Sequence, residues 1–197
     1  MSREQRVVVI DGHPDPAPDR FVHALAEAYE QGAKQSKHPV MRIRAADVTF
    51  PIIRNKEEYE RGDPPDSVRP CLDALEWATH LVILYPLWLG SVPALLKGLL
   101  EQLIRPGFAF STATLGHWPV KYLRGRSARI VVTMGMPTIA YRLRFGACGS
   151  RSLQSAVLAT SGFRPVRTTI IGNAERLPKT KRDTWIARMR DLGREAR

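Results

Sequence analysis

The segment at residues 81–98 constrains the fold of this chain more than any other. It begins with the apolar run LVILY, passes through a short loop that contains Trp88, and continues into a helical pattern with Pro93 near its first turn. In an open α/β sheet, a buried strand that leads through a loop into a helix places that loop at the carboxyl edge of the sheet, where such folds bind ligands. The segment therefore predicts an α/β fold with a binding crevice beside Trp88.

Strand-like and helix-like segments alternate along the chain. Apolar, β-branched runs predict strands at 6–11, 40–45, 81–85, 129–134 and 166–171. Helical patterns predict helices at 19–34, 67–78, 93–104, 150–160 and 180–194, with Thr180 and Asp183 as a capping pair in the last. Such alternation favours a mostly parallel sheet with helices on both faces. The pattern fits a flavodoxin-like doubly wound sheet of order 2-1-3-4-5.

Length and composition favour one soluble domain. The 197 residues are 44% hydrophobic and 25% charged, so we expect residues 1–197 to form a single globular domain. No apolar run reaches the ~20 residues that span a bilayer. The first residues lack the pattern of a secretory signal peptide. We therefore expect a cytoplasmic protein whose cysteines, Cys71 and Cys148, are reduced.

The net charge of +11 favours encounter with anions, such as phosphorylated cofactors, nucleic acids or a membrane surface. The basic residues form no single tract; they are densest at 121–129, 142–151 and 176–197. The sequence carries no helix-turn-helix, RRM or KH signature, so we do not expect a nucleic-acid partner. No two histidines have the spacing of metal ligands, so we expect no metal site.

The loop after the first strand is a candidate phosphate site. Gly12 allows a sharp exit from the strand, and the helix that follows offers free N–H groups and a dipole that favours anions. His13 and Arg20 add positive charge. A plain proline-rich turn with Asp19 as the helix cap is an equally good interpretation of the loop alone. The loop has neither a Gly-x-Gly-x-x-Gly run nor a P-loop, so it gives no support for those nucleotide sites.

The loops after the third and fourth strands supply further candidates. Residues 86–89 can wrap the edge of a planar ring with their backbone N–H groups while Trp88 covers its face, although Trp88 could instead be a core residue. Gly135 lets the backbone approach a ligand closely. Tyr141 offers a hydroxyl that donates to a reacting carbonyl or simply packs. The long stretches at 51–66 and 106–126 are candidate binding loops.

Together these segments resemble the flavodoxin-like NAD(P)H:quinone oxidoreductases. That family includes the modulator-of-drug-activity type and the ancillary subunits of glutathione-gated potassium efflux systems. The resemblance covers about residues 7–172. It depends on Gly12-His13-Pro14, on the central block at 85–98, on 105–110, on 123–126 and on 141–149.

The resemblance implies a non-covalently bound FMN or FAD, NAD(P)H as co-substrate, and a quinone or similar acceptor. By this resemblance, His13 and the backbone through Asp19, Arg20 and Phe21 hold the phosphate end of the flavin. Pro86, Leu87, Trp88 and Leu89 hold the isoalloxazine, and Thr133 and Gly135 contact its pyrimidine side. Tyr141 faces the reacting ring as the catalytic group.

This sequence differs from the usual family pattern at two positions. Pro18-Asp19-Arg20 replaces the usual serine of the phosphate loop, and Cys148 replaces a histidine that relays protons. The family also implies a homodimer with its site at the interface, where Tyr141 or the loop at 106–120 acts across it. The alternative function is that of a regulatory subunit, which binds flavin or nucleotide and gates a potassium efflux transporter in the membrane.

Overall fold

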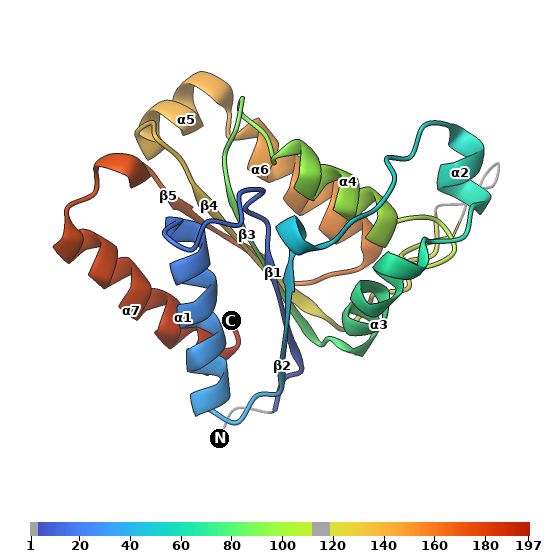
Figure 1. The fold of residues 1–197 in the computed structure, drawn as a ribbon, viewed down its shortest axis with the longest axis horizontal. Helices are drawn as coiled ribbons and strands as arrows, with labels where there is room; N and C mark the ends of the chain where they lie inside the picture. The colour runs from blue at the N-terminus through green and yellow to red at the C-terminus, as the bar shows by residue number, and fades with distance from the viewer. Residues whose placement is uncertain (1–3, 112–118) are drawn as a thin grey trace.

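In residues 4–111 and 119–197, which the computed structural model describes, five parallel strands form one sheet in the order β2-β1-β3-β4-β5 (Figure 1). The strands are β1 (Val7–Asp11), β2 (Val40–Arg44), β3 (His80–Pro86), β4 (Ser127–Thr133) and β5 (Val166–Ile171). Every strand predicted from the sequence is present, and the predicted order is confirmed.

Helices cover both faces of the sheet, as predicted. On one face, α1 (Phe21–Gln35) and α7 (Lys179–Glu195) pack side by side. On the other face lie α3 (Arg69–Trp77), α4 (Ala94–Leu103) and α6 (Cys148–Ser152), which continues as a π-helix at Leu153–Ala159. Shorter segments are α2 (Lys56–Arg61), α5 (Thr138–Phe145) and 3₁₀ turns at Ala45–Asp47, Asp66–Val68 and Ala174–Arg176.

The residues of β1 alternate between two hydrophobic cores. Val7 and Val9 belong to the core under α1 and α7, whereas Val8 and Ile10 belong to the core under α3 and α4. Because helices cover both faces, nearly every residue of β1, β3 and β4 is buried. This two-sided burial is the reason for the continuous apolar runs in the sequence.

Two predicted helix caps are wrong. Thr180 and Asp183 form no capping pair, because α7 begins directly after Pro178 and no side chain caps it. The fixed backbone angle of proline starts this helix instead. Asp19 does not cap α1 either; Arg20 occupies the cap position, and no side chain there hydrogen-bonds to the first turn.

Two helices were not predicted from the sequence. α2 has no buried residue and is held by Asn55, whose side chain accepts a hydrogen bond from the Glu58 N–H at 2.8 Å. Of the residues in α5, only Tyr141 is buried. Both segments therefore lack the apolar stripe on which helix prediction depends.

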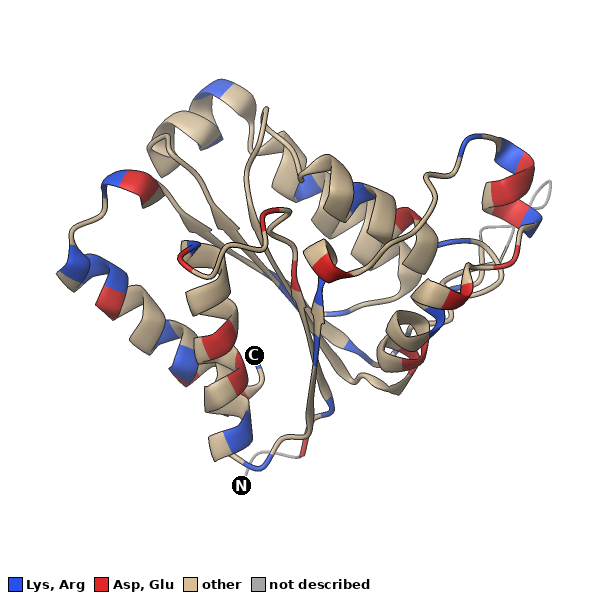
Figure 2. Ribbon diagram, in the orientation of Figure 1, with Lys and Arg blue, Asp and Glu red and all other residues tan. Residues whose placement is uncertain are grey.

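Charged residues follow no single face of the molecule. Figure 2 shows Lys and Arg on helices of both layers and on the loops between them, often beside Asp or Glu. Within residues 4–111 and 119–197, no helix combines the length and the apolar character needed to cross a membrane.

Candidate functional site

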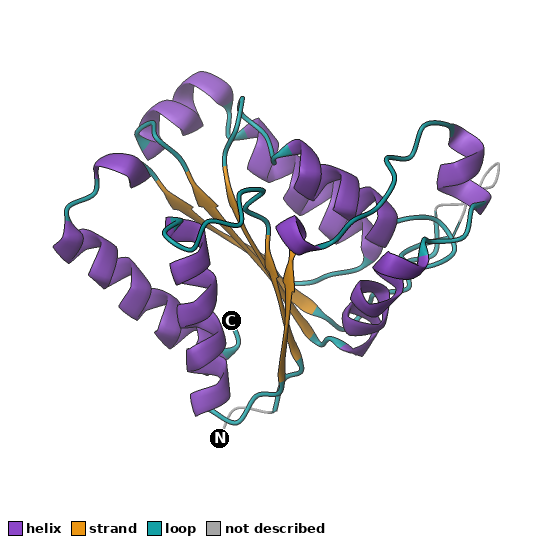
Figure 3. Ribbon diagram, viewed as in Figure 1, coloured by secondary structure: helices purple, strands orange, loops and turns teal. Residues whose placement is uncertain are grey.

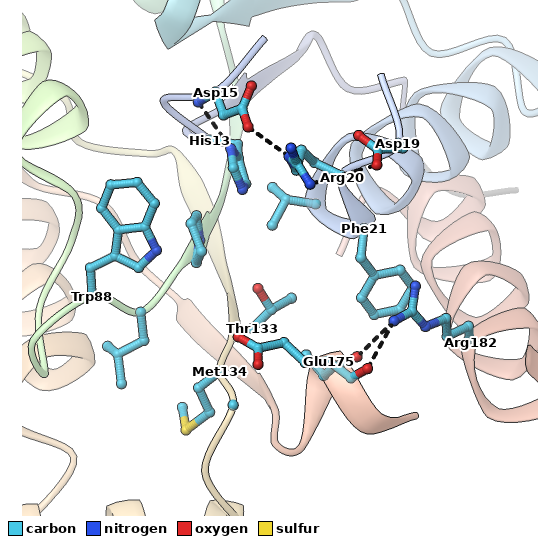
Figure 4. A pocket seen from close by; sticks show the side chains of 15 residues that line it. His13, Asp15, Asp19, Arg20, Phe21, Trp88, Thr133, Met134, Glu175 and Arg182 are labelled. Carbon is cyan, nitrogen blue, oxygen red and sulfur yellow. Dashed lines mark hydrogen bonds and ion pairs between the residues drawn. The ribbon is translucent and has the colours of Figure 1, made fainter. Parts of the chain in front are cut away.

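The loops after β1, β3 and β4 leave the sheet at neighbouring positions, because the register pairs Asp11 with Leu84 and Pro86 with Thr133. Figure 3 shows these loops at one edge of the sheet, its carboxyl edge. Together with the 3₁₀ turn after β5, they surround a cavity of about 590 Å³ (Figure 4). The cavity lies where the strand order changes direction between β1 and β3, which is where doubly wound sheets bind ligands.

The cavity brings together every predicted cofactor-binding residue except Leu89. These residues are His13, Asp19, Arg20, Phe21, Pro86, Leu87, Trp88, Thr133 and Gly135. Lining residues that were not predicted are Asp15, Val22, Met134, Ala174, Glu175 and Arg182. Glu175 and Arg182 follow β5. The signal that could have found them is the strand itself, because all parallel strands end at the same edge and the loop after β5 is polar.

Leu89 lies at the tip of a tight turn, outside the cavity. Trp88 and Ser91 exchange two backbone hydrogen bonds, of 3.0 and 2.9 Å, across this turn. Leu89 and Gly90 both have positive φ, 48° and 79°, as the two central residues of a type I′ turn require. The Leu89 side chain is fully exposed. The structure therefore corrects the prediction that Leu89 lines the ring site.

Two backbone N–H groups of this loop, those of Leu87 and Trp88, are also not free to bind a ring. The Leu87 N–H donates to the Thr133 carbonyl at 2.7 Å, and the Trp88 N–H is used within the turn. This part of the loop therefore contributes side chains to the cavity. The indole of Trp88, which is 50% exposed, forms a wall of it.

The Tyr141 side chain extends from α5 into the hydrophobic core, and the structure does not bring it to the cavity. Its side chain is fully buried, and its hydroxyl accepts a hydrogen bond from the Ser150 N–H at 3.1 Å. A hydroxyl enclosed in this way does not reach a substrate in the cavity of its own chain. Within one chain Tyr141 therefore packs in the core, and its predicted catalytic role across a subunit interface stays a prediction.

In the described residues of the two long stretches predicted as binding loops, none lines the cavity. The stretch at 51–66 carries α2, which lies at the opposite side of the molecule from the cavity (Figure 1). In the stretch at 106–126, residues 112–118 lie outside the described residues, and the described part does not line the cavity. Cys148, which stands where the family has a histidine, is exposed and does not line it either.

A buried ionic network fixes the loop between β1 and α1. The Asp11 carboxylate is fully buried and accepts from Arg42 Nη2 at 2.6 Å. Its Oδ2 also lies 2.7 Å from His23 Nδ1, while His23 Nε2 faces the Asp15 carbonyl at 3.0 Å. The Asp11 carboxylate and the Asp15 carbonyl thus hold the His23 ring from both of its nitrogens.

His13 presents a neutral imidazole to the cavity. Its Nδ1 accepts from the Asp15 N–H at 3.1 Å, so the ring proton lies on Nε2. Partial burial, and then repulsion from His23, lowers the pKa of His13 below that of an ordinary histidine. The ring meets Trp88 edge to face, with centroids 6.2 Å apart. His13 thus offers one N–H donor beside the indole, without a charge.

The start of α1 leaves two backbone N–H groups free at one end of the cavity. Among the described residues, nothing accepts from the N–H groups of Phe21 and Val22, which both line the cavity. The Arg20 guanidinium lies next to them but donates from Nε to Asp15 at 2.7 Å, and its Nη1 is 3.6 Å from Asp19. A phosphate at this end therefore meets two free amides and a guanidinium shared with two carboxylates.

Arg182 holds the turn after β5 against the cavity. It lies over the Phe21 ring at 5.4 Å and donates to the carbonyls of Ala174, Glu175 and Leu177, each at 3.3 Å. With the guanidinium engaged in this way, the Glu175 side chain extends past it into the cavity (Figure 4).

A family model described as a flavodoxin-like fold matches residues 5–192. The chain belongs to this flavodoxin-like family. The matched region contains all the strands of the sheet and every residue that lines the cavity. The family resemblance inferred from the sequence motifs is thus confirmed.

Proteins that are similar to this flavodoxin-like chain include named oxidoreductases. An uncharacterized NAD(P)H oxidoreductase of Haemophilus influenzae is 27% identical over 138 residues, which are 68% of this chain and 67% of that protein. The NAD(P)H:quinone oxidoreductase of Methanothermobacter marburgensis superposes with a TM-score of 0.78 at 21% identity, covering 98% of this chain and 96% of that one. An FMN-dependent NADH-azoreductase of Bacillus anthracis, solved with FMN, gives 0.74 at 14% identity over 95% and 97%.

Proposed function

We propose that this protein is an FMN-dependent NAD(P)H oxidoreductase that reduces quinones or similar acceptors. The observation that carries the proposal is the cavity itself, which joins the free amides of α1 to the Trp88 wall at the switch point of the sheet. The names of the Haemophilus influenzae and Bacillus anthracis relatives support NAD(P)H as donor and FMN, rather than FAD, as cofactor.

The cavity residues fit such a cofactor. The amides of Phe21 and Val22, with Arg20, suit a phosphate. The Trp88 indole and the Gly135 backbone suit a flat ring. The flavin, when bound, supplies the hydride transfer between NAD(P)H and the acceptor. The protein binds and orients it, and His13 Nε2 offers a neutral hydrogen-bond donor in the same cavity.

The FMN affinity of the Trp88→Ala variant tests whether Trp88 contacts the flavin ring. Loss of the indole removes one wall of the cavity, so we expect FMN affinity to fall by ~1–3 kcal/mol, the range known for bases stacked on aromatic side chains. The measurement is fluorescence titration of the apoprotein with FMN. Trp77→Ala is the control, because Trp77 is at the end of α3 and does not line the cavity. Equal FMN affinity in Trp88→Ala and the wild type contradicts the assignment.

Turnover separates the proposed enzyme from a regulatory subunit. We expect the FMN-loaded protein to oxidise NADPH or NADH and to do so faster when menadione is present. A protein that binds FMN tightly but does not turn over with either nucleotide would instead favour the regulatory alternative. Co-purification with a potassium efflux transporter is then the measurement that identifies the partner.

We also propose that two copies of this chain associate through the surface around α5. Ile139 and Leu143 of this helix are 68% and 82% exposed, and Leu89 and Trp88 are exposed on the turn after β3. The helix and the turn lie close together because Gly149, just after α5, packs against the Gly90 carbonyl. Exposed apolar surface of this kind marks an interaction site, here beside the cavity.

A further inference from the structure

Glu175 places a carboxylate at the wall formed by the loop after β4. Its Oε1 is 3.4 Å from the point that a Cβ of residue 135 would occupy, so the carboxylate lies in van der Waals range of Gly135. Figure 4 shows the Glu175 side chain directed into the cavity, beside Thr133. The carboxylate therefore lies beside the loop that follows β4.

The Glu175 carboxylate is not neutralised by the protein. In the described residues it makes neither an ion pair nor a side-chain hydrogen bond, in contrast to Asp15 and Asp19, which both approach Arg20. The nearby cation, Arg182, donates to the backbone carbonyls of Ala174, Glu175 and Leu177. The carboxylate is thus a strong acceptor that a ligand can use.

Gly135 supplies a donor beside this acceptor. Its N–H has no acceptor among the described residues, while the neighbouring N–H groups of Met134 and Leu87 donate to Ile171 and Thr133. The wall therefore carries an unused N–H next to an unused carboxylate. The complementary ligand edge is a carbonyl next to an N–H, as in a cyclic imide.

We propose that Glu175 is a specificity-determining residue that accepts a hydrogen bond from the imide N–H of the flavin, with Gly135 beside it for an imide carbonyl. This inference rests on the proposed function. It explains how the cavity selects the ring of its cofactor, although the main-chain donors of Leu87 and Trp88 are used within the protein.

The test compares FMN with 3-methyl-FMN, in which a methyl group replaces the imide proton. Both ligands carry the same phosphate, so the ratio of their dissociation constants cancels any general effect of charge on the anion. We expect the wild-type apoprotein to bind FMN at least about tenfold more tightly than 3-methyl-FMN, the effect of one hydrogen bond to a charged group. In Glu175→Ala the ratio falls towards one.

Two further variants sharpen the comparison. Glu175→Gln keeps an acceptor oxygen without the charge, so we expect an intermediate ratio. Glu57→Ala, on exposed α2, changes the net charge equally far from the cavity, and we expect the wild-type ratio. A Glu175→Ala protein that keeps the wild-type ratio overturns the role of Glu175 and leaves FMN binding intact. A folded wild-type protein that binds neither ligand overturns the proposed function as well.

Discussion

At the scale of single residues, Arg20 lies at the proposed phosphate site and is at the same time paired with a carboxylate. It lies where a phosphate would bind, but Asp15 accepts from its Nε at 2.7 Å. Asp15 also accepts from the Ala17 N–H, and this bond and then Arg20 lower the pKa of the Asp15 carboxyl below its ordinary value. A phosphate therefore competes with an ionised Asp15 for the guanidinium.

Asp15→Asn removes that competition. The amide oxygen can keep the bond to the Ala17 N–H while the negative charge disappears, so we expect FMN to bind about two- to fivefold more tightly, the range of a solvent-exposed ion pair. Riboflavin, which has no phosphate, should bind equally to both proteins. Asp19→Asn is the control with the smaller expected effect, because Asp19 is 3.6 Å from Arg20. Equal gains for FMN and riboflavin would contradict this account.

The sequence predicts the place of a residue better than its orientation. His13, Trp88 and Gly135 follow strand ends, and strand ends are visible in the sequence, so their position at the cavity was predictable. Tyr141 and Leu89 were assigned from the same loops, but one turns into the core and the other out to solvent. Those directions depend on the start of α5 and on a turn with two positive φ values.

At the scale of elements, the strands were the predictable part of the fold. The strand predicted at 6–11 is observed at 7–11, because two covered faces impose a long apolar run. The edge strand predicted at 166–171 has the observed bounds, because its β-branched residues favour an extended backbone. The helices that pack against the sheet were predictable because each presents a stripe of apolar residues to it. α5 was not, since it presents its apolar side chains Ile139 and Leu143 to solvent and buries one residue. A helix that buries no face does not need apolar residues at helical spacing, so its sequence carries no periodic signal.

The exposed apolar residues of α5 should form the interface between two copies of the chain. If two copies associate there, Ile139→Glu with Leu143→Glu places charges in the interface, and we expect the mass measured by light scattering to fall from that of a dimer to the 22.1 kDa of one chain. Ile52→Glu is the matched control, because Ile52 is 69% exposed in the stretch before α2 and should leave the dimer intact. A wild-type protein that is monomeric at micromolar concentration contradicts the proposed dimer.

At the scale of the whole molecule, the polar residues at the two ends of the sheet have different surroundings. The carboxyl end carries the cavity. At the amino end, His80 is fully buried between Tyr29 and Ser127, with its Nε2 2.9 Å from the Tyr29 hydroxyl and its Nδ1 2.7 Å from Ser127 Oγ. Burial, and then the positive charge of Arg129 and Arg167, lowers the pKa of His80 to about 3. This end therefore stabilises the fold only while His80 is neutral.

The stability of the protein should consequently fall as the pH drops below about 6.5, the ordinary pKa of histidine. In this range His80 binds a proton in the unfolded chain but not in the folded protein. Each pH unit down towards 3 therefore lowers the free energy of unfolding by ~1.4 kcal/mol through this residue. Urea unfolding followed by circular dichroism at pH 7.5 and 5.0 should therefore show a loss of about 2 kcal/mol from His80, in addition to the contributions of other groups.

His80→Gln isolates that contribution. Glutamine has no proton to gain in this range, so we expect the difference in unfolding free energy between the two pH values to shrink by about 2 kcal/mol, even if the variant is less stable at both. Tyr29→Phe is the control: it removes the hydroxyl beside His80 Nε2 but keeps the buried imidazole, so the pH dependence should persist. The same pH dependence in His80→Gln and the wild type would show that His80 is not the group that the folded protein keeps neutral.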